Sequence, residues 1–182
     1  MYFPYFRGRQ NELLCLRELV DNDLLSRHII PIIEPVRYSS TLFSTIRKFI
    51  AADKDIILIR NPSVGNYNSD IVGMNDKINN QESETKKKQM QKEFEENQTL
   101  LDDPHVIKGY LCNKAVINEC LNKTIPLDNI VLINTDLSNL DFYEDNVDLL
   151  NARYTVIPKN DDFHDVVQDN VIALEDSFKK AK

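Results

Sequence analysis

Glycine is scarce in this sequence, with four in 182 residues, and the glycine-dependent phosphate loops are absent. No G-x-G-x-x-G run is present to hold a dinucleotide, and no G-x-x-x-x-G-K-[ST] run is present to hold a nucleoside triphosphate. The G-x-S-x-G turn that presents the nucleophile of many Ser–His–Asp hydrolases is missing as well. These absences exclude the commonest motif-defined active sites.

Cysteine is also scarce. The three cysteines, Cys15, Cys112 and Cys120, are odd in number and contain no C-x-x-C spacing of a zinc site. A catalytic cysteine needs a histidine beside it, and the sequence places none of its three histidines there. We expect reduced, mostly buried thiols, which are typical of a cytoplasmic protein.

Long apolar runs and an excess of positive charge are both lacking. No segment approaches the ~20 consecutive apolar residues of a membrane span, and the first ten residues, MYFPYFRGRQ, do not resemble a signal peptide. The 22 Lys and Arg residues are outnumbered by 29 Asp and Glu residues, for a net charge of −7. This charge opposes non-specific nucleic-acid binding. We therefore expect a cytoplasmic protein with neither a membrane nor a nucleic acid as partner.

What the sequence does contain is a repeated alternation of apolar runs and amphipathic stretches. The runs are nearly continuous in Ile, Val and Leu, as in parallel strands covered on both faces. They are Tyr2–Phe6, Ile29–Ile33, Ile56–Ile59, Val106–Leu111, Ile130–Ile133, Tyr154–Ile157 and Val171–Leu174. Helices are predicted between them, over 11–25, 39–52, 115–121, 141–152 and 161–167. This alternation predicts an α/β fold.

A long polar segment, 65–101, interrupts the alternation. We expect a loop over 65–77, followed by one solvated helix that packs through a thin seam of Met90, Phe94 and Leu101. The KKK run at 86–88 is interpreted as a solvated helix face.

Outside this insert, strand ends recur at intervals close to the length of one βα unit. A (β/α)₈ barrel has eight such units in about 250 residues, whereas seven are counted here in 182. We predict a single α/β domain over 1–182 with an incomplete TIM-barrel-like fold that lacks its closing unit. The alternative is an open parallel sheet with helices on both faces. Either would leave open strand edges, to be covered by a second copy or by a partner protein.

Polar residues follow each apolar run. The carboxyl ends of parallel strands share one edge of a sheet, where α/β proteins build their sites. Glu34 therefore ends the run HIIPIIEPVR because the strand emerges there into a polar mouth. The candidates are Glu34, Glu175 and Asp176 as catalytic residues, and Arg7, Arg9, Arg60, Asn61, Asn134 and Lys159 as ligand-binding residues. The alternative is that these charges form salt bridges that close the strand ends.

Two kinds of chemistry fit such a mouth. Arginine forks suit phosphate or carboxylate, and the loop RNPSVGN at 60–66 could present backbone N–H groups to an anion, unless it is an ordinary Asn-Pro turn. Glu34, Asp136, Glu175 and Asp176 together could hold Mg²⁺, which beside arginine suits phosphoester chemistry. Glu175–Asp176 is equally typical of a helix start.

Four stretches carry a resemblance to a known family: MYFPYFRGRQNELLCLREL, IIPIIEPV, IRNPSVG and EDSFKKAK. With them the chain resembles the Beta-protein-like family of bacterial and phage proteins. The resemblance implies that the chain lacks a C-terminal part and that it belongs among mobile or phage-defence genes. The motif Y-F-P-Y-[FL]-R-G-[RK]-Q singles out 7–10 as its most characteristic part. The family supplies no catalytic residues.

Three functions remain open, and they leave undecided whether the protein is an enzyme. An enzyme-like barrel of a conflict system that binds an anionic or phosphorylated ligand requires Arg60 and Glu34 to face one cavity. A non-catalytic interaction scaffold requires closed strand ends and an insert helix that exposes Met90 and Phe94. A metal-dependent hydrolase or lyase requires a metal or a strongly perturbed carboxylate.

Overall fold

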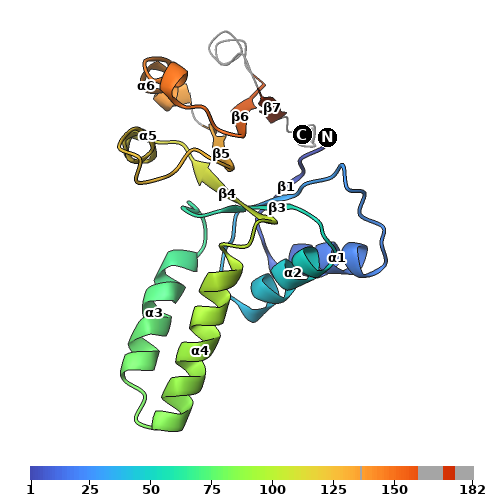
Figure 1. The fold of residues 1–182 in the computed structure, drawn as a ribbon, viewed down its shortest axis with the longest axis vertical. Helices are drawn as coiled ribbons and strands as arrows, with labels where there is room; N and C mark the ends of the chain where they lie inside the picture. The colour runs from blue at the N-terminus through green and yellow to red at the C-terminus, as the bar shows by residue number, and fades with distance from the viewer. Residues whose placement is uncertain (136, 160–169, 175–182) are drawn as a thin grey trace, which may run out of the picture. The chain divides into compact units, whose positions relative to one another are not determined.

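A computed structural model describes residues 1–135, 137–159 and 170–174. Seven parallel strands run in chain order, β1 to β7, in an open sheet with helices (Figure 1). The predicted α/β fold is confirmed, and the open parallel sheet is consistent with an incomplete barrel. The helix predicted over 161–167 lies outside the described residues. The chain forms two compact units, Met1–Ile107 and Lys108–Lys182.

The first unit contains three short strands and four helices. In it, Tyr5 of β1 lies opposite Ile32 of β2, which in turn lies opposite Ile57 of β3. The strands are β1 (Tyr5–Phe6), β2 (Ile32–Ile33) and β3 (Ile56–Ile59), and the helices are α1 (Gln10–Asp21), α2 (Ser40–Ala51), α3 (Tyr67–Asn79) and α4 (Glu84–Leu100).

Helices α1 and α2 form because their apolar residues recur at helical spacing and share one buried face. The hydroxyl of Ser39 caps α2 by accepting the Leu42 N–H at 3.3 Å. Their buried side chains form one core with alternate residues of β2 and β3. The residues of that core are Leu13, Leu16, Val20, Ile33, Leu42, Phe43, Ile46, Phe49, Ile56 and Leu58.

Helices α3 and α4 form an antiparallel hairpin that projects from the rest of the first unit (Figure 1). The prediction of a loop over 65–77 is wrong, because Tyr67–Asn79 is helical. Tyr67, Ile71, Met74 and Ile78 recur at helical spacing along one face, and Tyr67 and Ile78 are buried. The one helix predicted for this insert is present as α4.

Strand β4 crosses from the first unit into the second, whose described residues add three further strands and two helices. These elements are β4 (Val106–Leu111), α5 (Lys114–Leu121), β5 (Ile130–Ile133), α6 (Leu140–Glu144), β6 (Tyr154–Pro158) and β7 (Val171–Leu174), with 3₁₀ turns η1 (Leu137–Asn139) and η2 (Val147–Leu149). The helix predicted over 141–152 ends at Glu144, where the Asn146 amide donates to the Phe142 carbonyl at 2.8 Å. That bond satisfies a carbonyl at the helix end. In the described part of the chain, no helix has the length and apolar character needed to cross a membrane.

Candidate functional site

The carboxyl ends of β1, β2 and β3 bring together two of the predicted site residues. Arg7 follows β1 and Glu34 follows β2, and Arg7 Nη1 lies 3.8 Å from Glu34 Oε2. The Glu34 side chain is 3% exposed, whereas that of Arg7 is 53% exposed. The predicted emergence of Glu34 into an open polar mouth is therefore wrong. Its carboxylate is buried beneath the strand ends.

The buried carboxylate of Glu34 has a hydrogen-bond donor on each oxygen. Tyr5 Oη donates to Oε2 at 3.0 Å. The backbone N–H and the hydroxyl of Ser63 both donate to Oε1, each at 2.9 Å. A buried charge requires such partners. The Ser63 N–H, considered from the sequence as a donor to an external anion, is thus taken by Glu34.

The Tyr5 hydroxyl is held in its protonated, donating form. Burial is the main cause that raises the pKa of Tyr5, and the negative charge of Glu34 raises it further. The positive charge of Arg7 acts in the opposite direction. The sequence does not predict that Tyr5 is a partner of Glu34. Its pattern indicates only that Tyr5 belongs to the aromatic first strand.

The loop after β3 is locked onto the segment after β2 by its glycine. Gly65 has φ +71°, and a Cβ at this position would lie 2.3 Å from the Val36 carbonyl oxygen. The next residue, Asn66, donates its N–H to that oxygen at 2.8 Å. Only glycine allows this approach without strain, so Gly65 positions the loop that carries Ser63.

Arg60 contacts the end of α4. Its Nη1 donates to the Leu101 carbonyl at 3.2 Å. Its positive charge also partly offsets the burial that raises the pKa of Tyr67. Arg60 therefore links β3 to the hairpin, and the following residue, Asn61, is half-buried.

Arg9 is exposed at the N-cap of α1. Its backbone N–H donates to Glu12 Oε2 at 2.9 Å, a bond that closes the first turn of the helix. Arg9 thus takes part in capping α1.

In the second unit, Asn134 follows β5 and is 1% exposed. Among the described residues, neither its amide nitrogen nor its amide oxygen has a hydrogen-bond partner, although its backbone N–H donates to the Val156 carbonyl at 2.8 Å. Lys159 follows β6 and is exposed. Asp136, Glu175 and Asp176 lie outside the described residues.

No three His, Cys, Asp or Glu side chains within the described ranges are placed to hold a metal ion. The predicted Mg²⁺ site included Glu34, whose oxygens already accept hydrogen bonds from Tyr5 and Ser63. The other three carboxylates of that prediction are those outside the described residues.

The cysteines are free thiols. Cys15 is exposed, whereas Cys112 and Cys120 are buried. Burial raises the pKa of Cys112 to about 12 and also raises that of Cys120. Their thiolates are therefore scarce at neutral pH, which makes both poor nucleophiles.

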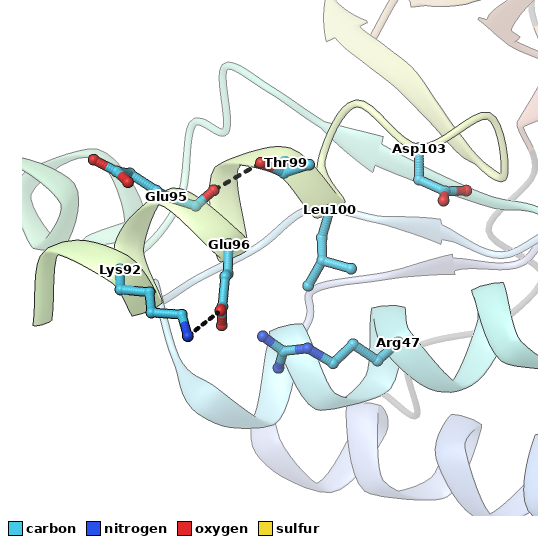
Figure 2. A pocket seen from close by; sticks show the side chains of 7 residues that line it. All are labelled: Arg47, Lys92, Glu95, Glu96, Thr99, Leu100 and Asp103. Carbon is cyan, nitrogen blue, oxygen red and sulfur yellow. Dashed lines mark hydrogen bonds and ion pairs between the residues drawn. The ribbon is translucent and has the colours of Figure 1, made fainter. Parts of the chain in front are cut away.

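A groove of about 510 Å³ lies between α2 and the C-terminal half of α4 (Figure 2). Arg47 extends from α2 toward α4, where its Nη2 donates to Asn97 Oδ1 at 2.7 Å. On α4, Lys92 Nζ lies 3.7 Å from Glu96 Oε1. The lining residues are Arg47, Lys92, Glu95, Glu96, Thr99, Leu100 and Asp103.

A second cavity, of about 220 Å³, lies where the start of α2 meets α3 and α4. It is lined by Tyr38, Ser39, Ser40, Phe43, Met74, Met90, Glu93, Phe94 and Asn97. The sequence predicts that Met90 and Phe94 form part of a packing seam. It does not predict the cavity, because the walls come from helices distant in sequence.

Comparison of the chain with family models, with curated proteins and with solved structures gives no match. The function proposed for the chain therefore rests on the geometry of its own residues.

Proposed function

We propose that the chain is a non-catalytic binding module that docks a partner protein through α4 and the grooves beside it. The observation that carries this proposal is the contrast between Glu34 and α4. The carboxylate of Glu34 is buried and hydrogen-bonded on both oxygens, whereas α4 borders two cavities.

The strand ends of the first unit support a structural role. A general base must reach the proton that it removes, and the Glu34 side chain is 3% exposed. Arg60, the other residue required for a shared ligand cavity, donates to Leu101 at the end of α4. These contacts close the strand ends.

Helix α4 has features of a binding surface. Asn97 is its buried residue, so its 17 residues gain little from packing against the rest of the unit. Its lysines at 86–88 lie toward the N-terminus, and Glu93, Glu95 and Glu96 lie toward the C-terminus. This order opposes the helix dipole. An unfavourable local charge pattern of this kind is typically found where function requires it.

The charge at the C-terminal half of α4 indicates the partner's chemistry. Glu95, Glu96 and Asp103 line the larger groove, against Lys92 and Arg47. Lys92 is paired with Glu96, and Arg47 is bonded to the Asn97 amide. We infer a partner segment that carries lysine or arginine, since opposite charge favours encounter and register.

The test compares two doubly charge-reversed variants of the full chain. A partner captured from the source cells is purified and titrated calorimetrically against wild type, Glu95→Lys/Glu96→Lys and the control Lys86→Glu/Lys87→Glu. We expect the first variant to weaken binding by about tenfold or more and the control to change it by less than about twofold. A gain in the control that mirrors the loss in the first variant would show that net charge alone is sensed, and equal losses in both would show that the groove charges are not specific; either result would overturn the proposal.

An anion-binding site at Arg7 is a second candidate. The exposed part of the Arg7 side chain, 53%, favours it, and guanidinium groups suit phosphate. Inorganic phosphate, nucleotides and sugar phosphates would then raise the melting temperature of wild type but not of Arg7→Gln. Such a result would favour an anion-binding barrel over the non-catalytic binding module. For that barrel, the family resemblance suggests a setting in phage defence.

A further inference from the structure

The smaller cavity of the first unit combines aromatic rings, thioethers and one carboxylate. Tyr38, Phe43 and Phe94 supply the rings, and Met74 and Met90 supply the thioethers. Its volume of about 220 Å³ suits a small group. Its ligand is inferred from its own lining and does not depend on the proposed docking of a protein.

The three rings face different directions. The Tyr38 ring meets Phe43 at 62° with centroids 4.6 Å apart, and it meets Phe94 at 34° with centroids 5.8 Å apart. These separations and inclinations are those of ordinary edge-to-face and tilted aromatic pairs, and all three rings also line the cavity. The faces of aromatic rings carry partial negative charge and attract cations within about 6 Å.

Glu93 is the charged residue of the lining. Its neighbours on α4 are engaged, since Glu95 accepts the Gln91 amide at 2.6 Å and Glu96 pairs with Lys92. By contrast, Glu93 has no cationic partner within the described part of the chain. Among the described residues no Lys or Arg lines this cavity, so the exposed Glu93 gives its lining a net negative charge.

The Tyr38 hydroxyl adds a polar group without a hydrogen bond. Its oxygen is buried and makes no hydrogen bond of good geometry with any described residue, although the Gln98 and Asn97 amides lie near it. Burial is the main cause that raises its pKa, and Glu93 raises it further, while the nearby amides of Gln98 and Asn97 lower it. The hydroxyl therefore stays neutral and can bond a polar group of a ligand.

We propose that this cavity binds an organic ammonium group, held by the three rings and by Glu93. An uncharged apolar ligand would leave the Glu93 charge unmatched, and an anion would be repelled by it. The start of α2 adds a partial positive charge of about half an elementary charge, which the full negative charge of Glu93 exceeds.

The test is an NMR titration of the full chain, in which the methyl groups of Met74 and Met90 report on the cavity. Choline is the probe, and 3,3-dimethylbutanol, its neutral isostere, is the matched control. We expect choline to shift both methyl signals and the isostere to bind at least about fivefold more weakly, as cation–π attraction predicts.

Three variants assign the contacts. Glu93→Gln and Phe94→Leu are each expected to weaken choline binding by about fivefold. Glu18→Gln, on α1 and in the lining of neither cavity, should leave it unchanged. Circular dichroism checks that each variant remains folded. Equal binding of choline and the isostere, or an undiminished affinity in Glu93→Gln, would overturn the proposal.

The source of the ammonium group is distinguished by a second arm, with a short peptide that carries trimethyllysine. Tighter binding of the peptide than of choline would identify the group as a partner's side chain. Tighter binding of choline would identify a free small molecule. Either result supports the ammonium site, whereas binding of neither overturns it and leaves docking along the larger groove to its own test.

Discussion

Ser63 donates its backbone N–H and its hydroxyl to the same carboxylate oxygen of Glu34, each at 2.9 Å, across 29 residues of sequence. The contact joins the loop after β3 to the end of β2. With the Tyr5 hydroxyl on the other oxygen, it connects all three strands of the first unit through one side chain. The buried carboxylate is therefore a structural centre.

Glu34→Gln should destabilise the protein by about 2–3 kcal/mol. The new amide can present an N–H to one of the donors of Tyr5 or Ser63, which would leave that buried donor without an acceptor. Ser63→Ala, which keeps the backbone N–H, should cost about 1 kcal/mol. Urea denaturation monitored by circular dichroism measures both. A Glu34→Gln protein as stable as wild type would show that the network contributes nothing net.

Tyr5 should make stability fall at alkaline pH. Its pKa is raised in the folded protein above the ordinary 10, so the folded protein keeps the proton to higher pH than the unfolded chain. Its contribution is therefore complete below pH 10 and is lost as the pH rises further.

The comparison that isolates this effect is wild type against Tyr5→Phe, with denaturant unfolding at several values above pH 10. Wild type should lose stability more steeply, by at most about 1.4 kcal/mol per pH unit. Solvent screening at the partly exposed Tyr5 ring makes this change in stability per pH unit smaller. Tyr2→Phe, which changes an exposed ring, is the control. Parallel curves for wild type and Tyr5→Phe would contradict the prediction.

Two glycines should respond to alanine in opposite directions. At Gly65 a Cβ would meet the Val36 carbonyl oxygen at 2.3 Å, in a backbone with φ +71°. Gly65→Ala should therefore cost at least about 2 kcal/mol. At Gly73, within α3, a Cβ would meet nothing within 4 Å, so Gly73→Ala should stabilise the protein by about 1 kcal/mol through helix propensity. Thermal unfolding of both variants measures these effects. Melting temperatures that change in the same direction would contradict the prediction.

The sequence alone predicts the pattern of strands because the strand side chains are almost completely buried. All four residues of β3 are 0% exposed, and a strand covered on both faces leaves a continuous apolar run. The first two runs were predicted too long for a physical reason. Pro4 and Pro31 lack the N–H that continues a ladder, so β1 and β2 are two residues each, with a single bridge between Tyr2 and Ile29 before them.

The candidate site is less predictable. Spacing places Glu34 at a strand end, but it does not encode that Ser63 and Tyr5 turn their donors inward. Helix α3 was missed because Asn, Ser and Gly residues obscure its thin stripe of Tyr67, Ile71, Met74 and Ile78. The cavities depend on how α2 packs against the hairpin, which no local pattern specifies.

Two buried asparagines provide the final prediction, since they differ in their partners. Asn97 is 6% exposed, and its Oδ1 accepts the Arg47 guanidinium at 2.7 Å. Asn134 is 1% exposed, and its side chain has no hydrogen bond to any residue that the structure describes. An unsatisfied buried amide carries its full desolvation cost, whereas a satisfied one does not.

Replacement by leucine, which has a similar branched shape, should therefore change the free energy of unfolding differently at Asn97 and at Asn134. Asn97→Leu should destabilise the protein by about 1–3 kcal/mol, because Arg47 loses its acceptor. Asn134→Leu should be neutral or should stabilise by about 1 kcal/mol, less any cost of its larger volume. Urea denaturation measures both. If Asn134→Leu is instead the more damaging change, the Asn134 amide must have a partner in solution. Such a partner would return it to the ligand-binding role that its place after β5 suggests.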